Sequence, residues 1–394
     1  MSDPTKPRPG ISISDFIFGH VRPNHQQAAP PTPPAPLGPL AAFQGNWVGN
    51  GFNTIFRPDN TATPTPLPIP VSPVPDNILE LNLTSETLAF SKSLGSVPNR
   101  GTTPQGDIFL NAVPYLQTIN DITIHGESVG IHFEPGMWIH VPATDAPKIG
   151  ETVTRMASIP HGTTIEAQGI FVTNPGPPTI APVDITPFVT GSNPRTLKPF
   201  ASQTAVTAGT ARIPQDLTSF IAAGTITQAI LTDPNTVIRN HISKQNITST
   251  TTIIISTGPP PAPPPPPPVP FGGGDANIAF LVGDAAAAKP NAQALQMTAI
   301  FWIETVEEVI LVPPGTMGTP FAVKGTPSVP GQRVPTFSGT LPFDIDTPRK
   351  IKMTFTQIQY TQTVLLNFNG LTWPHVSVNT LVPADDIIVP ASAF

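Results

Sequence analysis

The sequence predicts an all-β protein, built as a closed antiparallel β-barrel of about ten strands. Three observations favour this fold. Proline occurs 55 times in 394 residues, and a proline inside a helix removes a backbone donor and clashes with the preceding turn. Runs rich in Val, Ile, Thr and Phe recur along the chain, as is typical of strands. Clusters of Gly, Pro and Asn separate these runs and supply the turns.

Composition limits the classes of function. Charged residues make up 11% of the chain, the net charge is −6, and Lys and Arg are scattered, which argues against a nucleic-acid surface. No apolar run reaches the roughly 18 residues of a membrane-spanning helix, and the N-terminus lacks the apolar segment of a secretion signal. We therefore expect a cytoplasmic protein. Cysteine is absent, which excludes disulfides, thiolate metal ligands and thioether attachment of a cofactor.

Proline also divides the chain into regions. Residues 1–37 are predicted to be a Pro-rich leader, and residues 38–394 a single β-barrel domain. An insertion over residues 173–244 is expected to pack on the barrel. It should contain two short helices, one starting near Pro214 and one with Asp233 as its N-cap. Residues 259–274 and 313–342 are predicted Pro-rich loops.

The predicted strands follow in order. In the first, residues 43–56, Gly45, Gly49 and Gly51 surround Trp47, which suits a strand that bends around a ring plugging the end of a barrel. Further strands are predicted at residues 78–90, 107–119, 130–141, 152–159, 163–172, 246–256, 276–282 and 294–309. The strand at 130–141 alternates clearly. One face carries Ile131, Phe133, Met137, Ile139 and Val141, and the other carries His132, Glu134, Trp138 and His140.

The closing hairpin, residues 351–383, is the strongest local prediction. Its β-type run breaks only at Asn369-Gly370, a pair that favours a tight antiparallel turn. His375 follows soon after the turn and begins the last strand. Alternation places His375 with Ser377 and Asn379, opposite the apolar face of Val376, Val378 and Val382. His375 is therefore expected to point away from the core unless Pro374 shifts the register.

Structural roles are the simplest interpretation of the histidines. A single imidazole readily finds water or a backbone partner. His132 and Glu134 share a strand face, but no third ligand at a suitable spacing accompanies them, so a hydrogen bond or ion pair is favoured. His161 lies in the turn Pro160-His161-Gly162, from which it could reach across a pocket mouth.

Four pieces of the sequence, in order, resemble the nitrobindin family, whose members are small haem-binding β-barrels of the calycin type. The last piece resembles the family's closing hairpin, whose His is the proximal haem ligand. The likeness covers about half of the chain, and Ile139-His140 stands where the family has an Arg. The pieces are Gly45-Asn-Trp47-Val-Gly49-Asn-Gly51; His132-Phe-Glu134-Pro-Gly136-Met-Trp138 with residues 157–166; residues 284–292 with Phe301; and Tyr360-Thr361, Gly370-Leu371 and residues 375–381.

The resemblance implies a calycin-like barrel that holds haem b without covalent bonds, with His375 as the axial iron ligand. It implies reaction with nitric oxide, peroxynitrite or peroxide at a ferric iron, as in a peroxynitrite isomerase or a peroxidase-like protein. Whether the protein is an enzyme is left open. The porphyrin needs an apolar slot. The candidate cofactor-binding residues are His375, Phe133, Met137, Ile139, Met156, His161, Phe301 and Phe355, with Ile303 and Val364 as further wall candidates.

Two other functions remain open from the sequence. A lipocalin-like carrier would hold a fatty or aromatic small molecule in the same cavity without a metal. A structural or interaction protein would have a solidly packed barrel and would recruit partners through its Pro-rich loops. Each of the three is compatible with a homo-oligomer.

Overall fold

The computed structural model describes residues 34–61, 64–73, 75–207, 209–258, 272–278 and 291–394. Most of the Pro-rich leader therefore lies outside the described residues. So do most of the loop predicted at 259–274, the end of the strand predicted at 276–282, and residues 284–290 of the third resembling piece.

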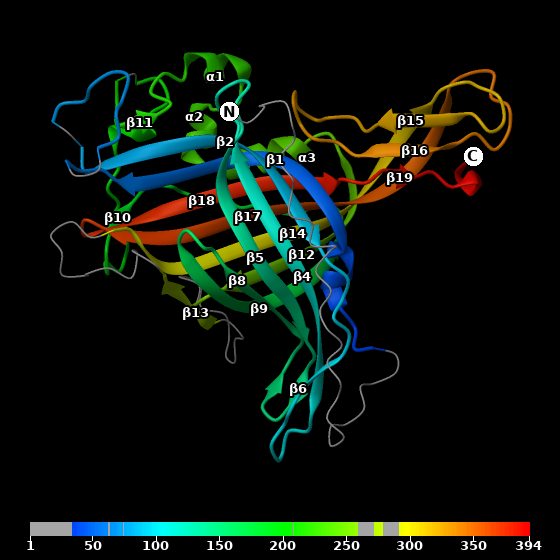
Figure 1. Cartoon of the computed structure of the whole chain (residues 1–394), viewed down its shortest axis with the longest axis horizontal. Coiled ribbons are helices and arrows are strands. Elements are labelled where there is room, and N and C mark those ends of the chain that lie inside the picture. The colour runs from blue at the N-terminus through cyan, green and yellow to red at the C-terminus, as the bar shows by residue number, and fades with distance from the viewer. Residues whose placement is uncertain (1–33, 62–63, 74, 208, 259–271, 279–290) are drawn as a thin grey trace, which may run out of the picture.

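Ten antiparallel strands close into a barrel, which confirms the predicted fold class (Figure 1). Around the ring the strand order is β2, β1, β18, β17, β14, β12, β9, β8, β5 and β4, and β4 pairs back to β2. Their bounds are β1 Gly45–Pro58, β2 Asn77–Phe90, β4 Ile108–Asp121, β5 Val129–Val141, β8 Thr152–Ser158, β9 Thr163–Pro175, β12 Asn246–Ser256, β14 Gln293–Val312, β17 Arg349–Phe368 and β18 Leu371–Pro383.

The closing hairpin forms as predicted. Strands β17 and β18 pair without interruption from the Phe368–Leu371 pair at the turn to the Ile358–Leu381 pair. Asn369 has φ 52° and Gly370 has φ 72°, so both turn residues are left-handed, as a two-residue turn matched to the twist of a hairpin requires.

One end of the barrel is closed by apolar side chains. The 3-10 helix Gly38–Phe43 leads into β1 and buries Phe43. The Phe43 ring lies 4.9 Å from Phe90 and 5.3 Å from Trp138, centroid to centroid. Trp47 donates its indole N–H to the Phe43 carbonyl at 2.8 Å. The plug expected from the glycine-flanked Trp47 is thus shared with several other rings.

The insertion packs on the outer face of the barrel and adds three short helices, where two were predicted (Figure 1). The helix expected near Pro214 begins only at Thr218, and the helix expected after Asp233 begins at Asn235. Ile226, Leu231 and Ile238 of the insertion pack with the outward side chains of β1, β2 and β18. Its elements are β10 Phe188–Val189, the 3-10 helix Ala201–Gln203, β11 Arg212–Ile213, α1 Thr218–Ala223, α2 Gln228–Thr232 and α3 Asn235–Ile242.

Residues 313–342, predicted as a Pro-rich loop, contain two strands. β15 and β16 form a small sheet with β19 beside the far ends of β14 and β17 (Figure 1). Phe321 and Phe337 of this sheet are buried against those ends, which explains why so short and Pro-flanked a segment forms strands. The remaining elements are β3 Val97–Asn99, β6 Thr144–Asp145, β7 Lys148–Ile149, β13 Gly272–Asn277, β15 Pro320–Lys324, β16 Thr336–Thr340, β19 Ile387–Ile388 and the 3-10 helix Ala391–Ala393.

Candidate functional site

His375 points into the barrel. It pairs with Val364 in the uninterrupted register of β17 and β18, so Pro374 shifts nothing. The opposite face of β18, with Val376 and Val378, packs against the insertion. The expectation that His375 turns away from the core is therefore wrong, because the apolar face of this strand is covered from outside and the polar face lines the interior.

The same inversion holds for β5. Trp138 belongs to the apolar core inside the barrel, and His132 and Glu134 share its face. Phe133, Met137 and Ile139 consequently face outward, and Phe133 is 37% exposed. Met156 pairs with Met137 and is 41% exposed. These four expected wall residues do not reach the interior.

The other expected wall residues divide between two places. Phe355 packs beneath the small β15–β16–β19 sheet, with its ring centroid 6.0 Å from that of Phe337, and is also outside the interior. Phe301, Ile303 and Val364 do belong to the barrel core. On β5 and β18 the alternation was predicted correctly, but hydrophobicity did not identify the inward face.

An apolar wall lies beside His375. Val364 is its cross-strand neighbour, and Met297 is the neighbour of Val364 on β14. Ile159 and Ile165, from the β8–β9 hairpin, belong to the same apolar cluster. We refer to Ile159, Ile165, Met297 and Val364 as the apolar wall. The turn of that hairpin carries His161.

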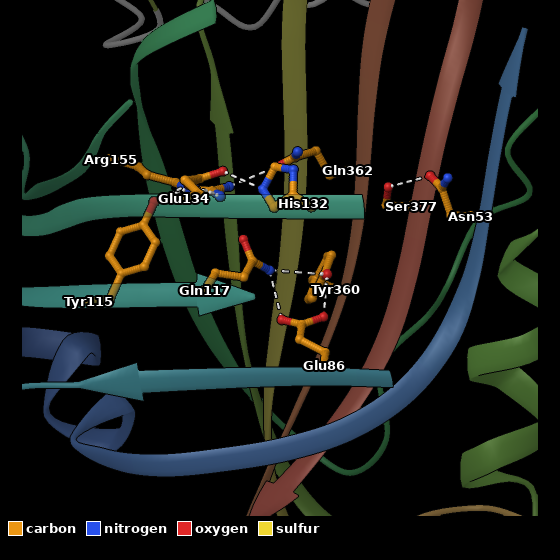
Figure 2. Close-up of polar contacts among 10 residues, drawn as sticks. All are labelled: Asn53, Glu86, Tyr115, Gln117, His132, Glu134, Arg155, Tyr360, Gln362 and Ser377. Atoms are coloured by element: carbon orange, nitrogen blue, oxygen red, sulfur yellow. Dashed lines mark hydrogen bonds and ion pairs between the residues drawn. The ribbon is translucent and has the colours of Figure 1, made fainter. Parts of the chain in front are cut away.

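A buried ion pair joins the neighbouring strands β5 and β8 on their inward faces (Figure 2). Arg155 Nη2 donates to Glu134 Oε1 at 2.5 Å, and Arg155 Nε donates to the Tyr115 hydroxyl at 2.8 Å. The Tyr115 hydroxyl in turn donates to Glu134 Oε1. Arg155 Nη1 donates to Gln362 Oε1 at 2.6 Å. The guanidinium also lies over the rings of Tyr115, Trp138 and Phe301.

The ion pair fixes the charge of its carboxylate. Burial alone would raise the pKa of Glu134, but the Arg155 guanidinium, His132 and Tyr115 together lower it to about 2. Burial would likewise lower the pKa of Arg155, and Glu134 and Tyr115 raise it above its ordinary value. Glu134 is therefore an anion, and Arg155 a cation, at every physiological pH.

A second buried carboxylate, Glu86 on β2, has only neutral donors (Figure 2). Tyr360 Oη donates to Oε2 at 2.6 Å, Asn379 Nδ2 to Oε2 at 2.7 Å, and Gln117 Nε2 to Oε1 at 2.7 Å. Burial raises the pKa of Glu86 to about 7, although the donors Tyr360 and Gln117 favour its ionised form.

Three histidines from separate elements approach one another at the open end of this interior. His132 Nε2 lies 3.1 Å from Glu134 Oε2, and the His132 ring meets His161 edge-on with centroids 5.3 Å apart. Burial, together with the nearby His132 and His161, lowers the pKa of His375 to about 4. The side chains of His132, His375 and Ser377 point inward yet are only partly buried, which indicates that solvent-sized space reaches them.

Hydrogen bonds determine which ring nitrogen of His375 carries the proton. Asn82 Nδ2 donates to the Asp121 carboxylate at 3.1 Å, which leaves Asn82 Oδ1 to accept from Asn53 Nδ2 at 3.0 Å. Asn53 Oδ1 must then accept, and His375 Nε2, at 2.8 Å, must donate. The lone pair of the neutral imidazole therefore lies on Nδ1. Ser377 Oγ donates to the same Asn53 oxygen at 2.9 Å (Figure 2).

Sequence reasoning missed most of the polar interior. Arg155 is the only charged side chain in β8, and a lone charge inside a β-type run is a signal of a buried partner. Glu86, Asn53 and Tyr360 come from three different strands, and their hydrogen-bond partners lie on other strands, so only the closed barrel identifies them. His161 is brought next to His132, and its place at a pocket mouth stays a prediction.

Comparisons of the chain with protein-family models, with curated proteins and with solved structures each found no match. Among the described residues, no helix has the length and apolar character needed to cross a membrane. Within the same residues, no group of three or more His, Asp or Glu side chains is arranged to hold a metal ion.

Proposed function

We propose that the protein binds haem b in the open end of its barrel, with His375 as the axial iron ligand, and that small oxidants or nitric oxide are its ligands. The observation that supports this proposal is the setting of His375. It is a neutral imidazole that faces the barrel interior, partly open to solvent, with its protonated nitrogen held by Asn53. The four sequence pieces that resemble nitrobindins point to the same residue.

The types of residue around His375 support this proposal. The porphyrin supplies four ligands itself, so the protein has to provide only one axial donor, which suits a site without a metal-binding group of its own. The apolar wall offers a surface for the macrocycle, and Asn53, Ser377 and His132 offer polar partners on the other sides. The hydrogen bond from Nε2 to Asn53 leaves the lone pair of His375 on Nδ1, which is the nitrogen that would bind the iron.

Each part of the site has a task that follows from its contacts. The Asp121–Asn82–Asn53 chain holds the His375 ring in one tautomer, which is the role that outer hydrogen bonds play for metal-binding histidines. The apolar wall excludes water from one side of the ligand. A haem held by His375 would supply an iron able to bind peroxide, peroxynitrite or nitric oxide.

The test compares His375 with a second histidine whose pKa is also lowered by burial. His241 on α3 is buried with its Nδ1 2.9 Å from Thr380 Oγ1, and burial lowers its pKa to about 4, as for His375. His241 lies on the outer side of β18, however, in the insertion. Wild type, His375→Ala and His241→Ala should be mixed with hemin, and the absorption spectrum and the iron–histidine stretching band recorded.

We expect wild type and His241→Ala to give the same Soret and iron–histidine bands. His375→Ala should lose the iron–histidine band and bind hemin at least 10-fold more weakly, because a metal–ligand bond is removed. Equal spectra for wild type and His375→Ala would move the ligand elsewhere. A protein that shows no Soret band with hemin, yet retains a fatty or aromatic molecule through purification, would instead be a lipocalin-like carrier.

A further inference from the structure

A groove lies between the insertion and the outer face of the barrel, outside the interior that holds His375. Its volume is about 550 Å³, which is within the range of sites for small ligands. The outward faces of the neighbouring strands β12, β14 and β17 form its floor. Residues 174–183 form its wall and end beside α3, where Asn235 Nδ2 donates to the Ala181 carbonyl at 2.7 Å. We refer to this space as the insertion groove.

The floor of the groove mixes hydroxyl groups with apolar side chains. Thr298 lies opposite Thr363 in the first row of outward side chains. Ile254 lies opposite Ile300 in the second row, and Trp302 belongs to the third. Since a strand rises about 3.3 Å per residue, the floor from Thr298 to Trp302 is about 13 Å long. The groove is therefore an elongated surface that offers polar and apolar contacts along its whole length.

Three polar groups of this floor have no partner among the described residues. The Trp302 side chain is only 3% exposed, yet its indole N–H donates to no described residue, whereas Trp47 and Trp373 donate to backbone carbonyls at 2.8 and 3.0 Å. The half-buried hydroxyls of Thr252 and Thr363 likewise bond to no described group. Because a buried N–H usually has an acceptor, Trp302 supplies a donor that a ligand in the groove can satisfy.

The lining also limits the charge of the ligand. The described residues that line the insertion groove include no Asp, Glu, Lys, Arg or His, in contrast to the barrel interior with Glu134 and Arg155. A charged ligand would therefore lose its hydration in the groove without gaining a counter-charge. The groove fits an uncharged ligand.

The free groups further distinguish between two kinds of uncharged ligand. A hydroxyl both donates and accepts, and the indole N–H only donates. A proline-rich peptide offers carbonyl acceptors but no proline N–H, so it would leave the acceptor capacity of Thr252 and Thr363 unused. A ligand with hydroxyl groups of its own uses both capacities.

We propose that the insertion groove binds an uncharged monosaccharide or disaccharide. The Trp302 N–H and the hydroxyls of Thr252 and Thr363 bond to the hydroxyls of the sugar. The C–H face of the sugar ring packs against Ile254 and Ile300. Since the groove lies outside the barrel, this site is independent of haem binding.

The first arm of the test uses the full chain without haem and a panel of neutral monosaccharides and disaccharides of glucose, galactose, mannose and N-acetylglucosamine. Glucuronic acid and a decaproline peptide serve as charged and proline-rich comparisons. Saturation-transfer NMR should show transfer from the protein to the C–H protons of at least one neutral sugar. It should show none to glucuronic acid or to the peptide. Titration then gives the Kd of the tightest-binding sugar.

The second arm measures that Kd in variants of the floor. Thr252→Val/Thr363→Val removes both free hydroxyls and keeps the shape of the side chains, so the Kd should rise on the order of 10-fold. Trp302→Phe keeps a ring and removes the donor, and should raise the Kd by about 5-fold. Should Trp302→Phe fail to fold, the threonine variant still decides, because its side chains are only half-buried.

Each variant has a matched control outside the groove. Thr154→Val removes a hydroxyl from the outward face of β8, opposite Ile139. Trp373→Phe removes an indole N–H that already donates to the Phe368 carbonyl. Neither control should change the Kd for the sugar, and neither should a saturating amount of hemin.

Four results would overturn the inference. One is that no neutral sugar of the panel binds, and another is that glucuronic acid or the peptide binds more tightly than every neutral sugar. The third is a Kd that Thr252→Val/Thr363→Val leaves unchanged or that Thr154→Val raises equally. The fourth is displacement of the sugar by hemin, which would place the sugar inside the barrel and not in the insertion groove.

Discussion

Two carboxylates lie inside the same barrel, both buried, and their surroundings give them opposite protonation behaviour. Glu134 faces the Arg155 guanidinium at 2.5 Å, and its pKa falls to about 2 against the effect of burial. Glu86 accepts three hydrogen bonds from neutral side chains, and burial raises its pKa to about 7. The number of hydrogen bonds that a carboxylate accepts does not decide whether its pKa is raised or lowered. A cation at contact distance does, since neutral donors offset only part of the cost of burying a charge.

The difference suggests a division of tasks within the interior. The Glu134–Arg155 cluster is a fixed pair of charges that can hold His132 in one orientation at all pH values of interest. The Glu86 cluster is a proton-binding group that changes its state near neutral pH. Figure 2 shows both carboxylates, Glu134 on β5 and Glu86 on β2, with Gln117 of β4 between them.

The largest expected effect comes from removing the cation. Arg155→Met leaves Glu134 as a buried carboxylate without a counter-charge, and we expect the free energy of unfolding at pH 7 to fall by about 3 to 5 kcal/mol. Chemical denaturation measures this loss. The double variant Arg155→Met/Glu134→Gln removes both charges and should recover part of it. A double variant no more stable than Arg155→Met would show that packing of the long Arg155 side chain, and not its charge, is what the interior needs.

That cluster also shows where sequence reasoning stops. The ten barrel strands, the Asn369-Gly370 turn and the alternation within β5 and β18 followed from residue patterns, because backbone preferences and side-chain period are local. The choice of inward face did not follow. On β18 the apolar side chains Val376 and Val378 are buried by the insertion, and on β5 the apolar Phe133 remains 37% exposed, so hydrophobicity points outward on both strands.

The hydrogen-bond partners of each polar residue could not be predicted either, because they come from distant parts of the chain. Arg155 meets Gln362 across the interior, and His375 meets Asn53 only after the first and last barrel strands pair. The resemblance to nitrobindins nevertheless selected His375 and His161, which do lie at the open end of the interior. The expected wall residues were only partly correct, since Phe301, Ile303 and Val364 belong to the barrel core, whereas Met156 and Phe355 lie outside it.

The second effect is the contribution of Glu86 to the pH dependence of the free energy of unfolding. Because its folded-state pKa of about 7 is above its ordinary value of 4.5, the folded chain binds this proton more tightly than the unfolded chain does. The contribution to stability is complete below about pH 4.5 and is lost as the pH rises through about 7. In Glu86→Gln that loss disappears.

The measurement is the free energy of unfolding at pH 5 and pH 8 for wild type and Glu86→Gln. Between these pH values the wild type should lose about 2 kcal/mol relative to the variant. Taking the difference between the two proteins cancels Glu304, whose pKa burial raises to about 8, and the histidines. Parallel profiles would mean that the three neutral donors keep Glu86 ionised after all.

The smallest effect sharpens the comparison with a matched pair of tyrosines. Each carboxylate accepts a bond from one buried tyrosine, Tyr115 for Glu134 and Tyr360 for Glu86. Tyr115→Phe removes a hydrogen bond to a group that is charged at every pH, so it should cost about 1 to 3 kcal/mol at pH 5 and pH 8 alike. Tyr360→Phe should cost about 1 kcal/mol at pH 5, where Glu86 is protonated, and more at pH 8, where the phenol stabilises an anion.

Denaturation curves of the two variants at pH 5 and pH 8 measure these losses of stability. If Tyr115→Phe also became more harmful with rising pH, the Glu134 cluster would be titrating, and the contrast between a fixed charge pair and a proton-binding carboxylate would fail.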